Sequence, residues 1–347
     1  MHFETFKLTG KLLQCASAVS LSLVSLYGAA ASADKPGEGV SVSPIFPPIA
    51  EERFRGEVAM AGLRELGYDV QEPKETEYAA MMVALSYGDA DFSVHLWDKL
   101  HDNFYQKVGG DETLVKAGDV IPGVLQGYLI DKKTADAYNI KHITDLKKPE
   151  IAKLFDIDSD GKADLTGCNP GWGCELTIDH HLKAYDLEKT VNHNRGSYFA
   201  LMADTITRYK QGQPILYYTW IPQWISGVLV IDKDVVFLEV PFTDLPDGKN
   251  DVETKFNGKN LGFAVDKVEA VLNKDFAEKN PAASKFLSLV QITTDDESKQ
   301  NLKMQKGENK PADIRRHADE WVAAHRQQFD AWLQASRAAA SKAQAAN

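Results

Sequence analysis

The stretch that decides how this chain is organised is Gly-Cys-Asn-Pro-Gly-Trp-Gly-Cys-Glu at positions 167–175. Two cysteines separated by five residues can close a tight ring, and Asn-Pro-Gly favours a turn. The residues from Glu175 to Tyr185 then read as a helix. Such a loop presents Trp172, together with the free backbone N–H groups at the start of the helix, to a molecule outside the chain. We interpret the rest of the sequence as the frame that holds this loop.

The N-terminal residues match an export signal. Lys7 and Lys11 give a basic start, an apolar run follows from about Leu12 to Tyr27, and residues 31–33 read Ala-Ser-Ala, the small-x-small pattern of a signal peptidase site. The run is too short and too rich in Ser and Ala for a good transmembrane anchor. We therefore expect a signal peptide at 1–33, cleaved after Ala33, and an exported protein.

Composition narrows the class of partner. The chain has 347 residues and a net charge of −11, and nucleic-acid binding would need a concentrated basic surface instead. Beyond the leader the cysteines are Cys168 and Cys174, and export favours a disulfide over a free thiol pair. A chain of this length usually divides into two domains. We expect a monomer with no nucleic-acid partner and no cofactor.

The order of the predicted elements indicates an α/β protein. Alternation and apolar runs predict strands at 40–46, 67–70, 91–97, 126–130, 213–220, 235–240 and 261–265. Helical spacing predicts helices at 48–66, 78–87, 132–138, 175–185, 195–209, 281–292, 296–304 and 312–339. Strand–helix–strand units of this length favour parallel sheets covered by helices. Because such units begin and close the chain while others fill its middle, we expect two lobes with a ligand cleft between them. The first lobe takes 34–130 and 266–347, the second takes 131–265, and the crossovers lie near Tyr128–Lys132 and Phe263–Val268.

The tryptophans fall into two groups. Trp321 and Trp332 lie in the last predicted helix at helical spacing with other apolar residues, so we interpret them as core. Trp97, Trp172 and Trp220 each lie at a strand end or in a Gly/Pro loop, where cleft residues of α/β proteins fall; Trp224 fits either group. Each of the three taken alone reads best as a core aromatic, and only their shared placement favours a ligand site.

Several indole faces in one cleft suit a quaternary ammonium group. This cation cannot donate hydrogen bonds, and aromatic faces attract it at about 0.5–2 kcal/mol per contact. A carboxylate on the same ligand would need donors. The N–H groups of Gly173 and Cys174 at a helix start suit an anion, and His101 lies one helical turn beyond Trp97.

These residues together resemble the periplasmic glycine betaine/proline betaine-binding proteins of ABC transporters. The resemblance rests on residues 167–175, on Tyr-Tyr-Thr-Trp at 217–220 and on Trp97 with His101, and it runs from about Val40 to the last helix. It implies a two-lobed periplasmic-binding-protein fold of type II-like organisation, which closes on its ligand by a hinge. The implied site is an ammonium cage of Trp97, Trp172 and Trp220, a carboxylate site of His101, Gly173 and Cys174, and a Cys168–Cys174 disulfide. Asp98-Lys99 and Ile221-Pro222-Gln223 depart from the family pattern, which expects Thr-Pro and Thr-Pro-Tyr.

One further motif points to a metal. Asp156, Asp158, Asp160 and Asp164, with Gly161, have the spacing of a calcium loop, but Gly167 takes the twelfth position, where a bidentate Glu is needed. A solvated acidic turn and a weak structural calcium site both remain open, and we commit to no metal. A zinc site of Cys168, Cys174 and the two histidines at 180–181 fits no common spacing.

The sequence therefore favours a receptor that binds glycine betaine or proline betaine and delivers it to a membrane permease for osmoprotectant uptake. A receptor of the same fold for choline, carnitine or another small solute is the alternative. An exported hydrolase of quaternary-ammonium esters would need a nucleophile and base near Trp172, and the sequence nominates none, so we expect no enzyme.

Overall fold

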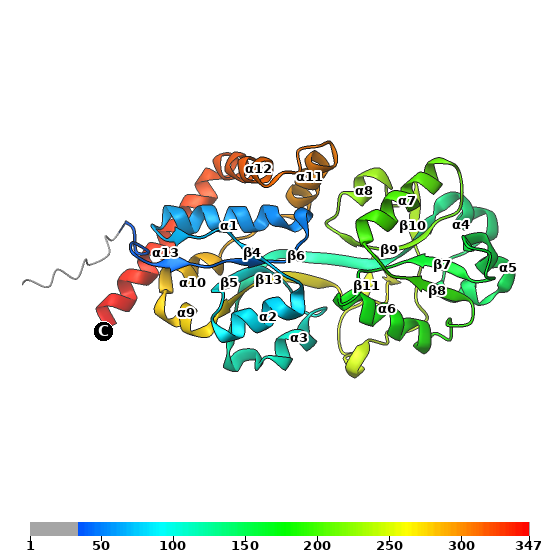
Figure 1. The fold of residues 1–347 in the computed structure, drawn as a ribbon, viewed down its shortest axis with the longest axis horizontal. Coiled ribbons are helices and arrows are strands. Elements are labelled where there is room, and N and C mark those ends of the chain that lie inside the picture. Colours follow the sequence, from blue (N-terminus) through cyan, green and yellow to red (C-terminus); the bar gives the residue numbers. More distant parts are fainter. Residues whose placement is uncertain (1–33, 347) are drawn as a thin grey trace, which may run out of the picture. The chain divides into compact units, whose positions relative to one another are not determined.

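The computed structural model describes residues 34–346 (Figure 1). The signal peptide expected at 1–33 lies outside these residues. No helix between residues 34 and 346 is both long and apolar enough to cross a membrane.

A seven-stranded mixed sheet forms the framework of the described chain, in the order β5-β13-β6-β9-β7-β8, with β10 also paired to β6. Its strands are β5 (Phe92–Trp97), β6 (Leu114–Asp131), β7 (Ala163–Thr166), β8 (Val191–Asn194), β9 (Leu216–Ile221), β10 (Val235–Phe237) and β13 (Asp266–Asn273). Two-residue strands form small side pairs: β1 (Ser41–Val42) with β3 (Asp69–Val70), β2 (Ile45–Phe46) with β4 (Lys74–Glu75), and β11 (Lys255–Phe256) with β12 (Lys259–Asn260).

Strand β6 runs through both halves of the sheet (Figure 1). Its residues from Leu114 to Val124 pair with β13, and those from Leu125 to Ile130 pair with β9. The sequence predicted a strand only at 126–130, because Lys116, Asp119, Pro122 and Gly123 weaken the strand signal of the preceding residues. Antiparallel pairing with β13 holds these residues extended despite their weak local preference.

The expectation of parallel sheets is only partly correct. β1 pairs with β3, β2 with β4, and β7 with both β8 and β9 in parallel. The strands β5, β9, β10, β6 and β13 pair antiparallel among themselves. The reason is that β6 pairs antiparallel with β13 in one half and with β9 in the other, and strand–helix order does not reveal such long-range pairings.

The strand predicted at 261–265 is wrong. Gly262 has a φ of +84°, which turns the chain there, and the strand begins only at Asp266. The charged residues of β13 hide its alternation, and in the fold Lys267 pairs with Asp119 and Glu269 across and along the strands.

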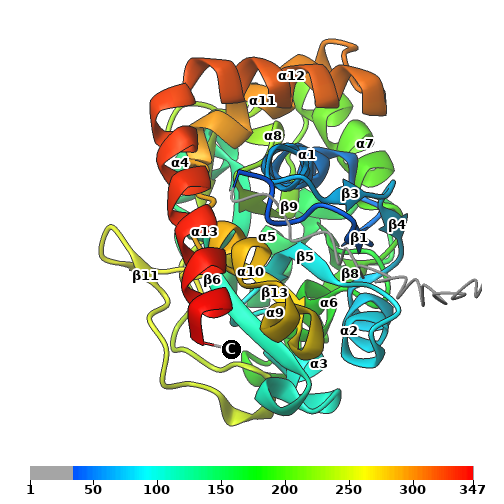
Figure 2. The same cartoon turned by 90° about the vertical axis from the view of Figure 1, so that its left-hand side faces the viewer.

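Helices cover the part of the sheet built by the two ends of the chain. They are η1 (Ala50–Glu52), α1 (Arg53–Glu65), α2 (Tyr78–Tyr87), α3 (Asp102–Lys107), η2 (Gly110–Glu112), α9 (Lys274–Lys279), α10 (Pro281–Leu287), α11 (Thr294–Gln305), α12 (Pro311–Ala324) and α13 (Arg326–Ala346). Helix α12 packs on α1, and α13 packs along α10 (Figure 2).

The single last helix predicted at 312–339 is two helices. The chain breaks at His325, whose backbone N–H and ring Nδ1 both lie within hydrogen-bond distance of the Trp321 carbonyl, at 2.9 and 2.8 Å. A side chain that competes for a helical carbonyl in this way ends the helix and lets the chain turn. Trp321 and Trp332 are both buried in the core, as predicted.

The middle of the chain supplies the remaining helices. They are α4 (Lys132–Tyr138), η3 (Ile143–Lys147), α5 (Pro149–Ala152), η4 (Lys153–Phe155), α6 (Gly173–Ala184), α7 (Tyr198–Lys210), α8 (Ile225–Val228) and η5 (Pro246–Gly248). Asp131 caps α4 by accepting the N–H of Thr134 at 2.8 Å, and it also accepts the N–H of Ile215. One carboxylate thus fixes the end of β6 against the strand that leads to Trp220.

Candidate ligand-binding site

The loop at 167–175 is closed by a disulfide between Cys168 and Cys174, the pairing that the resemblance implied. Helix α6 begins at Gly173, and Trp172 is its extended N-cap residue. Gly171 has a φ of +87°, a conformation that glycine adopts without strain. The loop therefore ends by turning the first amides of α6 and the Trp172 ring toward the same side.

A histidine side chain forms a hydrogen bond to the backbone of this loop. His193, at the end of β8, lies with Nε2 3.3 Å from the backbone N–H of Cys168 and Nδ1 2.8 Å from the Asp179 carboxylate. Since the Cys168 N–H must donate, Nε2 of His193 accepts. Nδ1 therefore carries the proton and donates a hydrogen bond to the Asp179 carboxylate. A Cβ atom at Gly167 would lie 1.9 Å from Nε2 of His193, so this position has room only for glycine.

All six predicted ligand-binding residues line one small cavity, which we call the aromatic cavity. Its volume is 20 Å³, and its walls are Ile49, Glu52, Tyr78, Trp97, Leu100, His101, Gln126, Trp172, Gly173, Cys174, Tyr218 and Trp220. These residues come from segments before, within and after β6. A space this small means that the walls must separate before a ligand larger than water enters.

The rings of the aromatic cavity are mutually ordered. Trp172 and Trp220 meet edge to face, with centroids 5.8 Å apart at 71°. Tyr198 packs behind them, 4.7 Å from the Trp220 ring, and its hydroxyl donates to the Tyr218 carbonyl and to Thr219. Such packing fixes ring orientation before any ligand arrives.

Two of the tryptophans donate their indole N–H to glutamates. Trp97 donates to Glu52 at 3.4 Å, and Trp172 donates to Glu77 at 3.0 Å. Glu52 also accepts the hydroxyl of Tyr78 at 2.9 Å and forms a buried ion pair with Arg55. With their N–H groups engaged at the ring edge, the indoles offer their faces to a ligand.

His101 supplies a neutral polar group to the aromatic cavity. It is 1% exposed, and its Nδ1 has no hydrogen-bond partner among residues 34–346. Burial, and then the positive charge of Arg55, lowers the pKa of His101 to about 3, so the ring is neutral near pH 7. A neutral imidazole has one N–H donor, which suits a carboxylate ligand.

The start of α6 supplies two more donors. Within the described part of the chain, the N–H groups of Gly173 and Cys174 have no acceptor, as expected for the first turn of a helix. A Cβ atom at Gly173 would lie 2.8 Å from Cγ and 2.9 Å from the carbonyl of Leu100. Glycine therefore lets the segment before His101 approach the helix end. Asp266 accepts the N–H groups of Lys99 and Leu100 and holds that segment in place.

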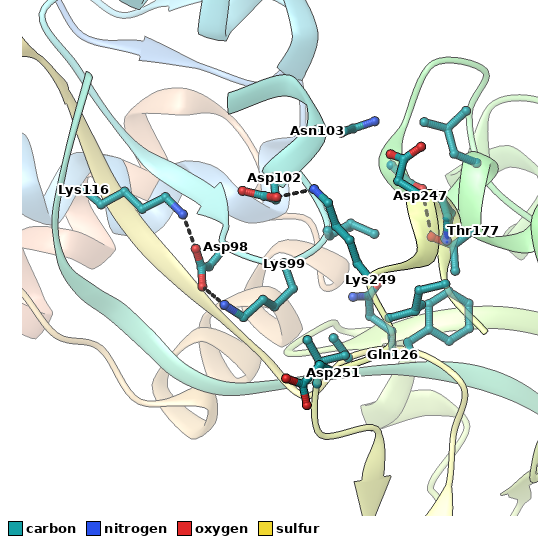
Figure 3. Close-up of a pocket in the computed structure, with 18 residues that line it drawn as sticks. Asp98, Lys99, Asp102, Asn103, Lys116, Gln126, Thr177, Asp247, Lys249 and Asp251 are labelled. Carbon is teal, nitrogen blue, oxygen red and sulfur yellow. Dashed lines mark hydrogen bonds and ion pairs between the residues drawn. The ribbon is translucent and has the colours of Figure 1, made fainter. Parts of the chain in front are cut away.

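A second, larger cavity adjoins the aromatic cavity and shares Leu100, Gln126 and Gly173 with it. We call it the charged cavity; it has a volume of 370 Å³, and its walls carry Asp98, Lys99, Asp102, Lys116, Asp247, Lys249 and Asp251 (Figure 3). Lys249 pairs with Asp102 across the cavity. Burial alone would raise the pKa of Asp98, but hydrogen bonds from Lys116 and Lys99 lower it to about 2.

One departure from the family pattern lies at the wall of the charged cavity. Asp98 and Lys99 form an ion pair at 2.8 Å at its wall, outside the aromatic cavity. At the other departure, Gln223 is buried and its side-chain carbonyl accepts the N–H of Trp224. Neither departure replaces a residue that lines the aromatic cavity.

Residues 40–324 match the model of the substrate-binding domain of ABC-type glycine betaine transport systems. The chain belongs to this family. It is 48% identical to the glycine betaine-binding periplasmic protein OusX of Dickeya dadantii, over 93% of this chain and 97% of the relative. It is 50% identical to the glycine betaine/proline betaine-binding periplasmic protein of Escherichia coli, over 89% and 93% of the two chains.

Solved structures agree on the fold. The lactococcal OpuAC in its closed-liganded conformation with glycine betaine matches with a TM-score of 0.64 at 22% identity, over 85% of this chain and 99% of that one. A choline binding protein in complex with choline matches with a TM-score of 0.66 at 17% identity, over 88% and 97%. The predicted α/β, two-lobed periplasmic-binding fold is confirmed. Membership of a substrate-binding family also confirms a binding protein and not an enzyme.

Four further residues of the aromatic cavity were not among the predicted site residues. Glu52, Tyr78, Gln126 and Tyr218 also line the aromatic cavity. Tyr218 had a signal, because it stands two residues before Trp220 in the same strand and so faces the same side. The others come from elements whose contact with the site is set only by the tertiary fold.

The acidic loop at 156–164 lies in the same half of this family member as the disulfide loop but takes no part in the aromatic cavity. Carboxylate oxygens of Asp156, Asp158 and Asp164 lie within 4.8 Å of one another. Asp160 falls outside this group and instead accepts from the backbone of Lys162 and from Asn192. Backbone N–H groups of the loop already occupy Asp156, so the geometry favours a self-contained acidic turn.

Proposed function

We propose that this chain is the periplasmic receptor of an ABC transporter and binds glycine betaine or proline betaine for osmoprotectant uptake. The observation that carries the proposal is the convergence of Trp97, Trp172 and Trp220 with His101 and the first amides of α6 on one cavity. Ring faces at one end and hydrogen-bond donors at the other match a ligand with a quaternary ammonium group and a carboxylate.

In this proposal the three tryptophans hold the ammonium group. Its charge is spread over methyl hydrogens, and ring faces attract it without leaving a hydrogen-bonding group unpaired. Each ring is 3–5% exposed, so the contact would form in a nearly dry site, where such attraction is strongest.

The carboxylate of the ligand takes the donors at the other end. The N–H groups of Gly173 and Cys174 point from a helix start, where the helix dipole favours an anion. His101 adds one neutral donor from the segment after β5. Because these donors come from different parts of the chain, the carboxylate joins the two sides of the cleft.

Ligand entry requires the two lobes to move apart. We propose that 34–130 with 266–347 form one lobe, that 131–265 form the other, and that the connections near 128–132 and 263–268 act as the hinge. The receptor is a monomer that releases its ligand to the membrane permease and binds no nucleic acid. Residues 1–33 are its signal peptide, removed on export.

Isothermal titration tests this function with glycine betaine, proline betaine, choline and carnitine, followed in parallel by tryptophan fluorescence. We expect tight binding of the first two ligands and a fluorescence change, since three indoles line the cavity. Neither heat nor fluorescence change with any of the four would overturn the proposal. A clear preference for choline would redirect it to the alternative receptor.

A further inference from the structure

Three hydrogen bonds of one kind, from a tryptophan indole N–H to a glutamate, lie in or near the aromatic cavity. Trp97 donates to Glu52, Trp172 to Glu77, and Trp224, just outside the cavity, donates to Glu51 at 3.1 Å. In the last two pairs the glutamate precedes β6 in sequence, whereas the tryptophan follows it. The two bonds therefore cross the cleft, and they put an acceptor on the indole edge.

The two glutamates that accept from cavity-lining indoles differ in whether a nearby cation compensates their negative charge. Glu52 is buried, and Arg55 forms an ion pair with it, which cancels its charge locally. Glu77 is the N-cap residue of α2 and forms no ion pair with any residue between 34 and 346. The Glu77 carboxylate is thus the uncompensated negative charge bonded to a ring of the cavity.

We propose that Glu77 is a positioning residue that makes the cavity select for positive charge, acting through Trp172. The inference rests on the proposed betaine-binding function and adds to it. A carboxylate on the indole N–H is a charge-assisted hydrogen bond, which polarises the ring and makes its face more negative. The same bond orients the ring only when the two sides of the cleft meet.

The position of Glu77 makes the effect separable from folding. The residue is exposed, and its side chain makes one hydrogen bond, to Trp172. Replacing it leaves no buried charge without a partner. Glu77→Gln keeps an oxygen that can accept the indole N–H but removes the charge, whereas Glu77→Ala removes both.

The experiment compares glycine betaine with its isostere tert-butylacetate, in which an uncharged carbon replaces the ammonium nitrogen and the carboxylate is kept. Affinities of both ligands are measured by titration for the wild type, Glu77→Gln and Glu77→Ala, with thermal melting as a check of folding. In Glu77→Gln we expect the preference for betaine over the isostere to fall by about threefold, a part of one cation–π contact. Glu77→Ala should in addition weaken both ligands, because the ring loses its anchor.

Glu51→Gln is the matched control. It alters the same kind of cross-cleft bond, to Trp224, whose ring does not line the aromatic cavity. Glu51 is partly buried, and burial raises its pKa to about 7, so its replacement by neutral glutamine is a mild change. This variant should change both affinities by one common factor and leave their ratio unaltered.

The outcomes separate the two ideas. If the wild type binds glycine betaine but Glu77→Gln keeps the wild-type ratio, the role of Glu77 is wrong and the receptor function stands. An equal fall of the ratio in Glu51→Gln would also refute it, because the effect would then belong to closure in general. If the wild type binds no betaine, both proposals fail together.

Discussion

The aromatic cavity and the charged cavity share a wall but are built on opposite principles. The first is enclosed by rings and holds one base and one acid. The base, His101, is neutral, and the acid, Glu52, forms an ion pair with Arg55. The second is about eighteen times larger by the 370 and 20 Å³ volumes and carries acids and lysines that pair with one another. The two neighbouring cavities thus differ in how they accommodate charged side chains.

This difference indicates which cavity should contribute most of the binding free energy. Groups in the aromatic cavity are buried, so contacts there are made without competition from water. Ion pairs in the charged cavity lie partly in solvent, where such pairs contribute about 0–1 kcal/mol. Substitutions in the aromatic cavity should therefore cost far more affinity than substitutions in the charged cavity.

Removal of the Trp172 ring should have the largest effect. Trp172→Ala loses a cation–π contact and apolar contact together, and we expect a loss of at least about 2 kcal/mol, roughly thirtyfold in Kd. Titration with glycine betaine measures it. Tyr87→Ala, which removes an aromatic that is 81% exposed and away from the site, should leave Kd unaltered. Unchanged binding by Trp172→Ala would remove this ring from the cage.

Loss of the His101 donor should come next and should depend on the ligand. His101→Ala removes one hydrogen bond to a carboxylate, worth about 1.5 kcal/mol, or about tenfold in Kd. Choline has no carboxylate, so any choline binding should change little. Equal losses for betaine and choline would show that His101 acts on the shape of the cavity instead.

Removal of the disulfide should have an intermediate effect. In Cys168→Ser/Cys174→Ser the loop must be ordered when the ligand binds, and we expect about fivefold weaker binding from that lost preorganisation. Stability should fall by about 2 kcal/mol, the value expected for so short a loop. Urea unfolding and titration measure the two effects. A variant with wild-type Kd would show that His193 and the turn suffice to hold the loop.

Disruption of the charged cavity should have a small effect. Lys249→Met breaks the pair with Asp102 across the cleft, and because both side chains are partly exposed we expect at most about a twofold rise in Kd. Lys279→Met, which breaks an exposed pair with Asp275 on α9, serves as the control. A tenfold effect at Lys249 would erase the contrast between the two cavities.

The pH dependence should be the weakest effect. Burial and Arg55 hold the pKa of His101 near 3, below its usual value, so the ring stays neutral at pH 6–8 and Kd should be constant there. A bound carboxylate raises the pKa of this histidine, so binding can only tighten as the pH falls toward that raised value. Titrations at several pH values check the sign; weaker binding at pH 6 than at pH 8 would contradict a neutral donor.

The sequence predicted which residues meet in the aromatic cavity better than it predicted how the strands of the sheet pair. Trp97, Trp172 and Trp220 carry local signals, namely a strand end or a Gly/Pro loop, and these signals lie in short stretches. The bounds of α2 and α4 follow from local periodicity in the same way. The direction of strand pairing does not, because it depends on long-range partners, such as β6 with β13 and with β9. Glu77 carries no local signal at all, since its role depends on a partner ninety-five positions away.

The long strand β6 has a consequence for how the protein unfolds. Its first part belongs to a ladder with β13 and its second part to a ladder with β9, so one unbroken backbone segment is a structural member of both halves. The two ladders join between Val124 and Leu125, so unfolding of one half loosens the strand at the point where the ladder of the other half begins. Cooperative melting in a single step follows from this shared strand, even though the ligand requires the two halves to move.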